Sequence, residues 1–389
     1  MQKNWLLIIF ITISSCLYAQ SLKDLTFGAE NTFDVVTWNI EWFPKNGQAT
    51  ADSVEKIIRA LDVEILALQE IEDTFLFNKM INNLDGYDWF YDPGYHGGLA
   101  YVYKPDIVEV LDFYEIYTDE IYWRPLPRAP LVLEINFRGK KYIFINNHFK
   151  CCGDGFLNLN DDGDEEKRRL DASLHIKYYI DTYFPDDRVI LLGDLNDLIT
   201  DIPEHNVFQS FIDDTENYLM ADMAIAEGSQ SVWSYPGWPS HIDHIIITNE
   251  LFEAFGRDSS DIRTIGIEDY YSGGFREYDA NVTDHRPLAL KLQTSSSELN
   301  DENNLILQDI LNIYPNPSRD KIQITFNPVP QNGAIEIYNL GGQLMERLQV
   351  GTGQSSCSCN TEKLSKGIYI VKLTSGLELI AIEKLVIIK

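Results

Sequence analysis

Acidic and amide side chains recur at the ends of apolar segments of this sequence. The clearest case is Gly193–Asp197, which reads Gly-Asp-Leu-Asn-Asp and directly follows the apolar run Val189–Leu192. A carboxylate and an amide two residues apart can share one task, because Asp194 can take a proton from water while Asn196 holds the water or a phosphate oxygen. A turn rich in Asp and Asn that merely closes a strand would read the same way. This segment alone leaves catalysis and a structural turn equally open.

Two earlier segments also end in acids. Trp38–Glu41 reads Trp-Asn-Ile-Glu, and Leu68–Glu70 reads Leu-Gln-Glu. A carboxylate at a strand end can hold Mg²⁺, which takes one or two protein carboxylates and keeps its other positions for water and phosphate oxygens. For either segment alone, a solvated acid at a strand end is the simpler interpretation.

Imidazoles accompany acids in Ser240–Ile245 and Thr283–Leu288, and His148 in Asn146–Lys150 ends a further apolar run. An Asp that bonds one ring nitrogen fixes the tautomer of the His and favours its protonated form, which suits a ring that faces a phosphoryl oxygen. A single Asp-His pair is more often a polar group of a turn. The case for catalysis therefore depends on the whole set.

The elements that must position these side chains alternate in type between residues 30 and 294, which indicates a mixed α/β domain. Asp52 and Glu55 have the spacing of a capping box before an amphipathic helix that ends near Leu61. The polar residues follow the strands at one end, as in the sites of α/β enzymes. The predicted strands are Phe33–Ile40, Glu64–Gln69, Gly98–Tyr103, Leu131–Phe137, Lys141–Asn146, Arg188–Leu192, Ile242–Thr248 and Arg286–Leu292.

In this order, the motifs resemble the endonuclease/exonuclease/phosphatase superfamily, which includes pancreatic-type deoxyribonuclease. The resemblance covers residues 30–294, and it implies a four-layer α/β sandwich in which two mixed β-sheets pack face to face with helices outside. The matching segments are Trp38-Asn39-Ile40, Gln69-Glu70, Arg128 before Ala129-Pro130, Asn147-His148, Gly193-Asp194-Leu195-Asn196, Ile242-Asp243 and Thr283-Asp284-His285-Arg286-Pro287.

The resemblance also implies a divalent-metal site. Glu70 is expected to be the principal ligand of Mg²⁺ or Mn²⁺, with Asn39 and Asp284 completing the environment of metal and phosphate. Asp194 is expected to orient or deprotonate the attacking water, with help from Asn196. The metal would act as Lewis acid and template during an in-line attack at phosphorus.

The same resemblance implies roles for the imidazoles. His285, paired with Asp243, is expected to stabilise phosphate charge, and His148 to contact the phosphate or assist the leaving oxygen. Arg128 is expected to serve the same end or to brace the rim. Glu41 is matched by an acid only in some branches of the family, and other residues are expected at His241 and His244, so the roles of these three stay open.

The substrate stays open within this class. His148 is typical of the deoxyribonuclease, inositol-phosphatase and sphingomyelinase branches, whereas abasic-site endonucleases usually carry a Tyr motif here. The resemblance favours an extracellular nuclease acting on DNA or RNA over a phosphatase or a sphingomyelinase-type phosphodiesterase. A surface binding protein with a dead catalytic scaffold is the remote alternative. Aromatic residues expected at the surface could stack on bases or meet a membrane: Trp89, Phe90, Tyr91, Tyr95, Trp233, Tyr235 and Trp238.

The composition fits a globular protein, with 44% hydrophobic and 23% charged residues among 389. The formal charge of −29 is uneven, since residues 21–296 hold 22 Lys and Arg against 50 Asp and Glu, a net −28. A region with this charge repels polyanions at long range, so any nucleic-acid binding must come from local cationic side chains and bound metal. We expect a monomer.

The N-terminus predicts export. Lys3 precedes an apolar run that is shorter than the roughly 20 residues of a membrane span, and small residues end at Ala19, so residues 1–19 are expected to be a signal peptide. Cleavage and lipidation at Cys16 is an alternative. The other four cysteines form the near pairs Cys151-Cys152 and Cys357–Cys359, whose partners cannot be read from spacing.

Cys151–Arg169 resembles an inserted acidic loop beside His148, and Asn158–Arg169 is its acidic part. Its Asn and Asp spacing faintly matches a Ca²⁺ loop, but the twelfth position is Arg169 where Glu is needed, so a solvated turn is the simpler interpretation.

A second unit follows a polar linker at residues 295–309. Short apolar runs separated by Gly, Asn and Ser turns predict a small β-sandwich over residues 310–389. Tyr314-Pro315-Asn316-Pro317, Gly367–Val371 and a lysine-containing terminus resemble the C-terminal sorting domain of the type IX secretion pathway of Bacteroidetes. The type IX machinery is the implied partner, and the implied location is the cell surface or the medium.

Overall fold

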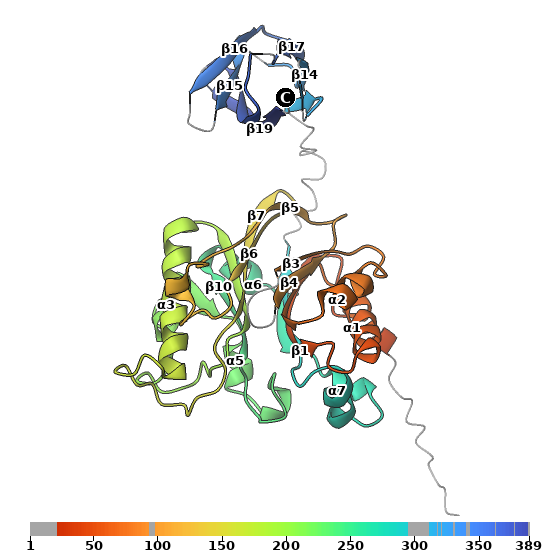
Figure 1. Ribbon diagram of the computed structural model, residues 1–389, viewed down its shortest axis with the longest axis vertical. Helices are drawn as coiled ribbons and strands as arrows, with labels where there is room; N and C mark the ends of the chain where they lie inside the picture. The colour runs from red at the N-terminus through yellow and green to blue at the C-terminus, as the bar shows by residue number, and fades with distance from the viewer. Residues whose placement is uncertain are drawn as a thin grey trace, which may run out of the picture. The chain divides into compact units, whose positions relative to one another are not determined.

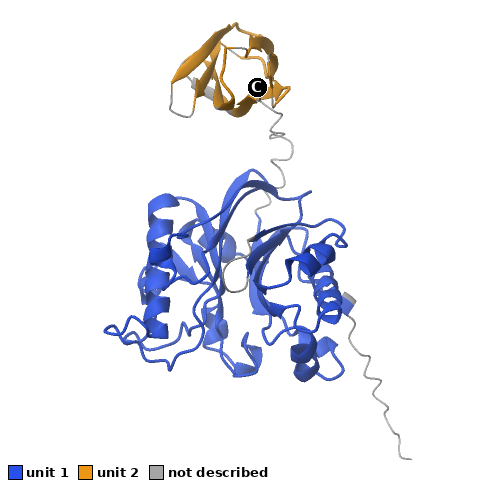
Figure 2. Ribbon diagram, in the orientation of Figure 1, with its two compact units in different colours: residues 1–295 blue, residues 296–389 orange. Residues whose placement is uncertain are grey.

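Two compact units divide the chain, residues 1–295 and 296–389 (Figure 2). The expected signal peptide at 1–19, Cys16 and the linker at 295–309 lie outside the described residues. The computed structural model describes residues 22–92, 98–294, 311–316, 318–319, 321–329, 331–339, 343–361, 363–376 and 378–387.

The first unit contains two six-stranded mixed sheets (Figure 1). Strands β1 and β2 are parallel in the first sheet, and β7 and β8 are parallel in the second. The first sheet has the order β11 (Asp261–Thr264), β12 (Leu288–Gln293), β1 (Thr32–Phe43), β2 (Ile65–Ile71), β4 (Gly98–Tyr103), β3 (Asp88–Asp92). The second has the order β5 (Glu109–Glu115), β6 (Leu131–Phe137), β7 (Lys140–His148), β8 (Arg188–Asp194), β10 (Asp243–Thr248), β9 (Tyr218–Met220).

The strands bury both faces, and this produces four layers. In β1, Phe33 and Val35 pack between the two sheets, whereas Trp38 and Ile40 pack under the helices of the first sheet. This is the alternation of a strand with apolar side chains on both faces. The helices are α1 (Gln48–Leu61), α2 (Thr74–Ile81) and α7 (Phe275–Asn281) over the first sheet, α3 (Glu165–Tyr183), α4 (Gln209–Ile212) and α5 (Met223–Ala226) over the second, and the short α6 (Phe252–Phe255).

Short 3₁₀ turns join several of these elements. They are η1 (Leu22–Asp24), η2 (Glu120–Tyr122), η3 (Gln230–Val232), η4 (Asn249–Leu251) and η5 (Ile267–Tyr270).

The eight predicted strands are all present, with ends that shift by a few residues, but β3, β5, β9 and β11 were not predicted. The predicted capping box is wrong. Helix α1 begins at Gln48 with Gly47 as its N-cap, and Asp52 lies inside it, where its Oδ1 accepts from Gln48 Nε2 at 2.7 Å. The helix starts a turn early because Thr50 and Ala51 are buried and extend its apolar face.

A close approach brings the ends of β7 and β8 together. Gly193 has φ +144°, and a Cβ there would lie 1.9 Å from the Asn147 carbonyl oxygen, so only glycine fits. Buried amides link the two sheets nearby, since Gln69 Nε2 donates to Asn146 Oδ1 at 2.8 Å and Asn146 Nδ2 donates to the Leu68 carbonyl at 3.0 Å. The edge that carries the polar residues is therefore fixed from both sheets.

The second unit is a small β-sandwich, as expected. Its core includes Ile322, Ile335 and Val371, from strands of both sheets. Asn316 ties the Tyr-Pro-Asn-Pro segment to the last strand, because its Oδ1 accepts from the Val386 amide at 2.8 Å. The three-stranded sheet has the order β13 (Leu311–Tyr314), β14 (Lys321–Phe326), β17 (Ser356–Asn360), and the four-stranded sheet has the order β16 (Leu344–Val350), β15 (Gly333–Asn339), β18 (Gly367–Ser375), β19 (Glu378–Ile387).

Within the described residues, no helix is both long and apolar enough to cross a membrane.

Candidate active site

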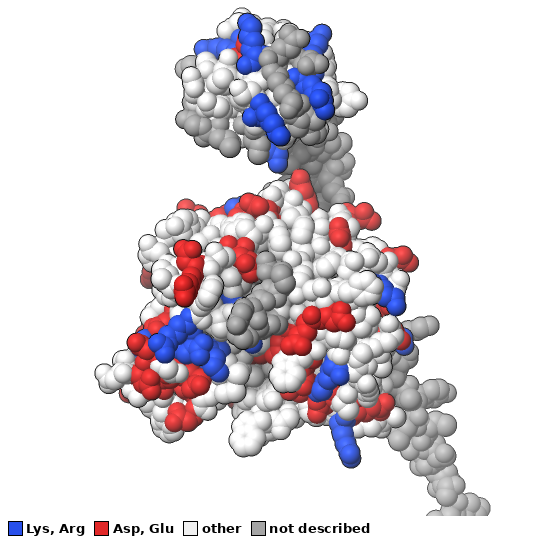
Figure 3. All heavy atoms as spheres, viewed as in Figure 1, with Lys and Arg blue, Asp and Glu red and all other residues white. Residues whose placement is uncertain are grey.

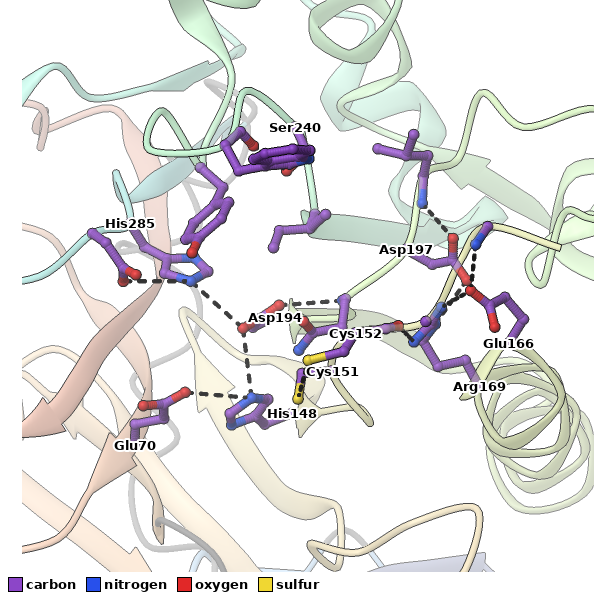
Figure 4. Close-up of a pocket in the computed structure, with 18 of the residues that line it drawn as sticks. Glu70, His148, Cys151, Cys152, Glu166, Arg169, Asp194, Asp197, Ser240 and His285 are labelled. Atoms are coloured by element: carbon purple, nitrogen blue, oxygen red, sulfur yellow. Dashed lines mark hydrogen bonds and ion pairs between the residues drawn. The ribbon is translucent and has the colours of Figure 1, made fainter. Parts of the chain in front are cut away.

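The carboxyl ends of the parallel strands meet at one edge of the first unit. Asn39 and Glu70 come from β1 and β2, while His148 and Asp194 are paired across β7 and β8. Asp243 pairs with Asp194 across the antiparallel β10. A cavity of about 560 Å³ opens at this edge, and Figure 4 shows Glu70, His148, Asp194 and His285 around it.

Asn39 connects two carboxylates. Its Nδ2 donates to Glu70 Oε1 at 3.0 Å and to Asp194 Oδ2 at 2.9 Å, while its Oδ1 accepts from the Glu41 amide at 2.9 Å. The amide therefore presents its NH₂ group to the acids, and its oxygen is already bonded. In this conformation Asn39 orients the two carboxylates, and its expected role as a metal ligand remains a prediction.

The backbone at this edge is strained. Glu41, Trp42, Glu70 and Asn196 have φ values of 37°, 46°, 64° and 56°, a region that side chains other than glycine adopt at a cost. Such residues persist only where their surroundings over-determine them, and they cluster at functional sites. Here the Trp42 amide donates to Glu70 Oε2 at 3.0 Å, which fixes the carboxylate.

A buried ion pair forms one side of the site. His285 Nδ1 bonds Asp243 Oδ2 at 2.8 Å, and its Nε2 lies 3.8 Å from an oxygen of both Asp194 and Asp284. Burial alone would lower the pKa of His285, but Asp243, Asp194 and Asp284 outweigh it and raise the pKa to about 10. His285 is therefore an imidazolium at neutral pH, aimed into the cavity.

Asp194 is the carboxylate at the centre of the site. Its Oδ2 lies 3.5 Å from His148 Nε2, and its Oδ1 accepts from the Asn196 amide at 3.2 Å. Burial raises the pKa of Asp194 to about 7, with Asp243 and Glu70 adding to the rise and His285 and Asn39 opposing it. A carboxyl that titrates near neutrality can accept a proton efficiently.

His148 differs from His285 in charge. It is buried, and desolvation, Arg128 and His285 hold its pKa well below the usual range, so the ring is neutral. Its Nδ1 is buried and has no hydrogen-bond partner in the part of the chain that the structure describes. Arg128 Nη1 donates to the backbone carbonyls of His148 at 3.4 Å and of Phe149 at 3.3 Å, and this braces the end of β7.

The residues present fit a divalent cation. Glu70, His148 and Asp194 offer three ligand atoms within 4.8 Å of one another. Asp284 Oδ1 is buried nearby and has no hydrogen-bond partner among the described residues, so a cation or its water would satisfy it. Oxygen atoms from acids are the ligands that Mg²⁺ prefers. Glu41, in contrast, accepts from Lys45 Nζ and from the Asp284 amide, so it supports the loop that carries Asp284.

The sequence comparisons identify both units. The family described as Endonuclease/Exonuclease/phosphatase matches residues 36–285, which is more than half of the chain. The chain belongs to this family. Its members are metal-dependent phosphoester hydrolases, and the catalytic unit is such an enzyme. The Secretion system C-terminal sorting domain matches residues 312–389, so the second unit is a type IX sorting domain. No curated protein sequence matches the chain closely enough to count as a relative.

Solved structures show the same fold as the family. TDP2 from D. rerio, complexed with single strand DNA product, has 14% identity over 68% of this chain and 100% of that chain, with a TM-score of 0.51. The human Nocturnin catalytic domain with bound sulfate anion has 14% identity over 70% of this chain and 98% of that chain, with a TM-score of 0.49. An endonuclease/exonuclease/phosphatase from Bacteroides vulgatus has 14% identity over 68% of this chain and 100% of that chain, with a TM-score of 0.47.

A second buried cluster, which the sequence did not predict, lies behind the site. Asp222 Oδ2 accepts from His241 Nε2 at 2.9 Å and from His244 Nδ1 at 2.6 Å. His244 Nε2 donates to the Asp197 carbonyl at 2.8 Å, so both of its ring nitrogens face acceptors. Burial would lower the pKa of His244, but Asp222 and the Asp197 carbonyl raise it. His244 thus supports the turn after β8, whereas His241 Nδ1 accepts from the Ser234 amide at 3.3 Å. Asp222 lies 19 residues before His241 and 22 before His244, and no motif marks it.

The acidic loop behaves as a turn. Asp164 Oδ1 caps helix α3 by accepting from the Lys167 amide at 2.8 Å, and Asp161 Oδ1 accepts from the Gly163 amide. Arg169, at the twelfth position, is buried and donates to Asp197 Oδ2 at 2.7 Å. The described residues bring together two groups of three possible metal ligands, and neither includes this loop.

Proposed function

We propose that this enzyme is an exported nuclease that hydrolyses phosphodiester bonds of single-stranded DNA or RNA. The observation that supports this substrate is a pair of exposed tryptophans on the cavity that holds the reacting residues. Trp42 is 67% exposed and Trp238 is 80% exposed, and both line that cavity. Unpaired bases stack on aromatic faces, and a contact of this kind contributes ~1–3 kcal/mol per base.

Tyr95 lies outside the described residues, and the other expected surface aromatics behave in two ways. Trp89 and Tyr91 pack against the core of the first sheet, and Phe90 packs between the sheets, so these three do not meet substrate. Tyr235 packs against the His285 ring with centroids 4.9 Å apart. Trp238 stays a candidate for stacking on a base, as the sequence suggested. Trp42 is a second candidate, because the strained end of β1 turns its side chain outward.

In the proposed reaction, Asp194 accepts the proton of the attacking water, and Asn196 helps to hold that water. His285, charged through its pair with Asp243, stabilises negative charge on the phosphoryl oxygens. His148, which is neutral, can donate a hydrogen bond to the phosphate or the leaving oxygen. Preorganised donors of this kind in a buried site are usually the largest contribution to catalysis.

A divalent cation, when bound, neutralises charge that grows on the phosphoryl oxygens and lowers the barrier to attack. We propose Glu70 and Asp284 as its principal protein ligands, with Asn39 holding Glu70 in place. Mg²⁺ or Mn²⁺ fits this set of oxygen atoms best, and Ca²⁺ is the alternative.

The negative charge of the protein favours a single-stranded nucleic acid over a duplex as the substrate. Asp and Glu side chains spread over the face of the first unit in Figure 3, and the whole chain carries −29. A long duplex would bring two charged strands against this surface, whereas a single strand needs only a local path. In D. rerio TDP2, which shares the fold, a single strand DNA product is bound.

The same acidic surface favours a second candidate. A small phosphomonoester or the zwitterionic headgroup of a sphingomyelin-type lipid would meet less long-range repulsion than nucleic acid. The exposed Trp238 could then contact the lipid surface instead of a base.

An assay with matched variants separates these candidates. The purified protein with Mg²⁺ would be given single-stranded DNA, single-stranded RNA, plasmid, sphingomyelin vesicles and a sugar phosphate. We expect the single strands to be cleaved fastest. Trp238→Ala should raise the Michaelis constant for them about tenfold, which corresponds to ~1.4 kcal/mol, without changing turnover of methyl p-nitrophenyl phosphate. Trp123→Ala is the control, because Trp123 is also exposed (58%) but does not line the cavity. Preferred cleavage of sphingomyelin or the sugar phosphate would overturn the proposal.

A further inference from the structure

Two consecutive cysteines form part of the cavity wall. Cys151 and Cys152 follow the end of β7 and line the cavity beside His148, as Figure 4 shows. Their Sγ atoms lie 3.0 Å apart, and both are free thiols in the structure. Cys152 has φ +72°, a conformation that a cysteine rarely adopts without support from its surroundings.

That support is a buried ion pair of helix α3. Arg169 Nη1 donates to the carbonyls of Lys150 at 2.8 Å and of Cys152 at 2.6 Å, and Arg169 Nη2 lies 3.2 Å from Glu166 Oε1. The same Glu166 oxygen accepts from the Gly155 amide at 2.7 Å. Both charged side chains are almost fully buried. The protein therefore holds the two thiols face to face.

Glycine at position 153 completes this arrangement. Gly153 has φ +112°, and a Cβ there would lie 2.2 Å from Glu166 Oε1. A larger residue would expel the Glu166 carboxylate from the loop. The Cys-Cys-Gly backbone is thus a built feature of the fold rather than a loose surface turn.

We propose that Cys151 and Cys152 form a disulfide with each other in the exported enzyme, as a covalent modification in the wall of the active-site cavity. The reaction is thiol–disulfide exchange with a low-molecular-weight or protein disulfide. One cysteine thiolate attacks the oxidant and releases its first thiol. The second cysteine then attacks the mixed disulfide and releases the second thiol. Two protein thiols are oxidised to one disulfide, and the oxidant is reduced to two thiols.

The bond should be easy to reverse. The Cα atoms of neighbouring residues are about 3.8 Å apart, whereas disulfides usually join Cα atoms about 4.4–6.8 Å apart. Strained or exposed disulfides are more readily reduced than relaxed structural ones. The modification should therefore follow the redox state of the surroundings.

A path connects this bond to the reacting centre. Arg169, which holds the Cys152 carbonyl, also donates from Nε to Asp197 Oδ2 at 2.7 Å. Asp197 directly follows Asn196 in the turn that carries the proposed base. Formation of the disulfide closes a ring that contains the peptide between the two cysteines, and this rotates that peptide. Arg169 transmits the rotation to the turn that carries Asn196 and Asp197. This effect on turnover rests on the proposed function, whereas the bond itself does not.

The bond is tested by mass spectrometry on the full-length protein. The purified protein would be reduced, freed of reductant, incubated with oxidised glutathione, denatured and treated with iodoacetamide. We expect the peptide with Cys151 and Cys152 to be two hydrogen atoms lighter than the dithiol and unalkylated, and to take two alkyl groups after reduction. Cys357 and Cys359 of β17 serve as an internal control and should be alkylated without reduction.

Alkylation of Cys151 and Cys152 without reduction would overturn the proposal, as would a bond from either to Cys357, to Cys359 or to a second chain. A stable glutathione adduct on the wild type would also overturn it. The single variant Cys152→Ser should instead accumulate that adduct on Cys151, because the second attack is lost.

Turnover gives the second measurement. We expect hydrolysis of a small phosphodiester by the oxidised wild type to change several-fold on reduction, while the Cys151→Ser/Cys152→Ser double variant stays insensitive to reductant. If the mass measurement shows the bond but reduction leaves turnover unchanged, the connection through Arg169 is wrong. If neither wild type nor variants hydrolyse any phosphodiester, the proposed function fails while the bond stands.

Discussion

At the scale of single residues, the two buried histidines of the site differ in charge. His285 is held as a cation by Asp243, while His148 is held neutral because its burial, and then Arg128 and His285, oppose its protonation. Asp194 lies between them with a pKa raised to about 7. One edge thus offers a proton acceptor, a fixed positive charge and a neutral donor, which is the set that phosphodiester hydrolysis requires.

The first prediction concerns the proposed base. Asp194→Asn should lower turnover by something on the order of 10²-fold or more, because the amide keeps the shape of the carboxyl but cannot take a proton. Steady-state kinetics and circular dichroism would measure it. Asp186→Asn, an exposed change just before the opposite end of the same strand, should leave turnover unchanged. A folded Asp194→Asn protein with near-normal turnover would refute the assignment.

The two imidazoles make a second prediction. His285→Ala and His148→Ala should each lower the turnover number more than they raise the Michaelis constant, since both side chains face charge that develops during attack. His175→Ala on helix α3 provides the control. If either site variant changes only the Michaelis constant, that His binds substrate and has no role in the chemical step.

At the scale of elements, two parallel strand pairs and one antiparallel strand bring the site together. Asn39 and Glu70 lie near the ends of β1 and β2, whereas His148 and Asp194 end β7 and β8 and Asp243 begins β10. Behind them, Asp222 fixes the turn after β8 through His244. A charge in that position is costly unless it is fully paired, so the cluster should be a pH-dependent source of stability.

The third prediction tests that cluster. Burial would raise the pKa of Asp222, but His244 and His241 hold it below its usual range, so its contribution is present above pH ~4 and is lost in stronger acid. Burial would lower the pKa of His244, but Asp222, with Asp197 and Asp243, raises it, so that contribution is full below pH ~6.5 and fades as pH rises.

Asp222→Asn should therefore lower the free energy of unfolding by ~3–5 kcal/mol between about pH 4 and pH 6.5, and by less in alkali. Urea unfolding at several pH values would measure the difference. Glu227→Gln, an exposed change at the end of α5, should stay within ~0.5 kcal/mol of wild type. A loss for Asp222→Asn that is the same at every pH would contradict the linkage.

The sequence predicted the strands that carry the site better than the contacts around it. Periodicity and apolar runs mark β1, β2, β7 and β8, and the polar residues at their ends can be read directly from the sequence. The role of Asn39 as a link between two carboxylates is not visible, because it depends on which amide atom faces the acids. Arg169 was interpreted as the failed end of a metal loop, but its buried contacts with Glu166 and Asp197 form only after the chain folds.

At the scale of the whole molecule, the two units have different compositions. The formal charge lies almost entirely in the catalytic unit, and all residues of the proposed site come from it. The sorting domain has its own core, built from residues such as Ile322 and Val371. Separate cores predict separate tasks, hydrolysis in one unit and export in the other.

The fourth prediction follows from that division. Deleting residues 310–389 should leave hydrolysis intact but retain the enzyme in the periplasm of a host with the type IX pathway. Activity would be assayed in the medium, at the cell surface and in the periplasm. Equal release of the full-length and shortened proteins would show that the tail does not direct export. Loss of activity in the purified shortened protein would show that the tail completes the enzyme.

The central claim is metal-assisted phosphodiester hydrolysis by the residues around Asp194 and Glu70. The most direct measurement is cleavage of an end-labelled single-stranded oligonucleotide by the wild type and by Glu70→Gln, with Mg²⁺, with a chelator, and with Mg²⁺ restored. The account predicts that wild-type cleavage stops with the chelator and returns with Mg²⁺, and that Glu70→Gln needs a much higher Mg²⁺ concentration for half-maximal activity. Full cleavage by the wild type in chelator, or the same Mg²⁺ dependence in both proteins, would contradict it.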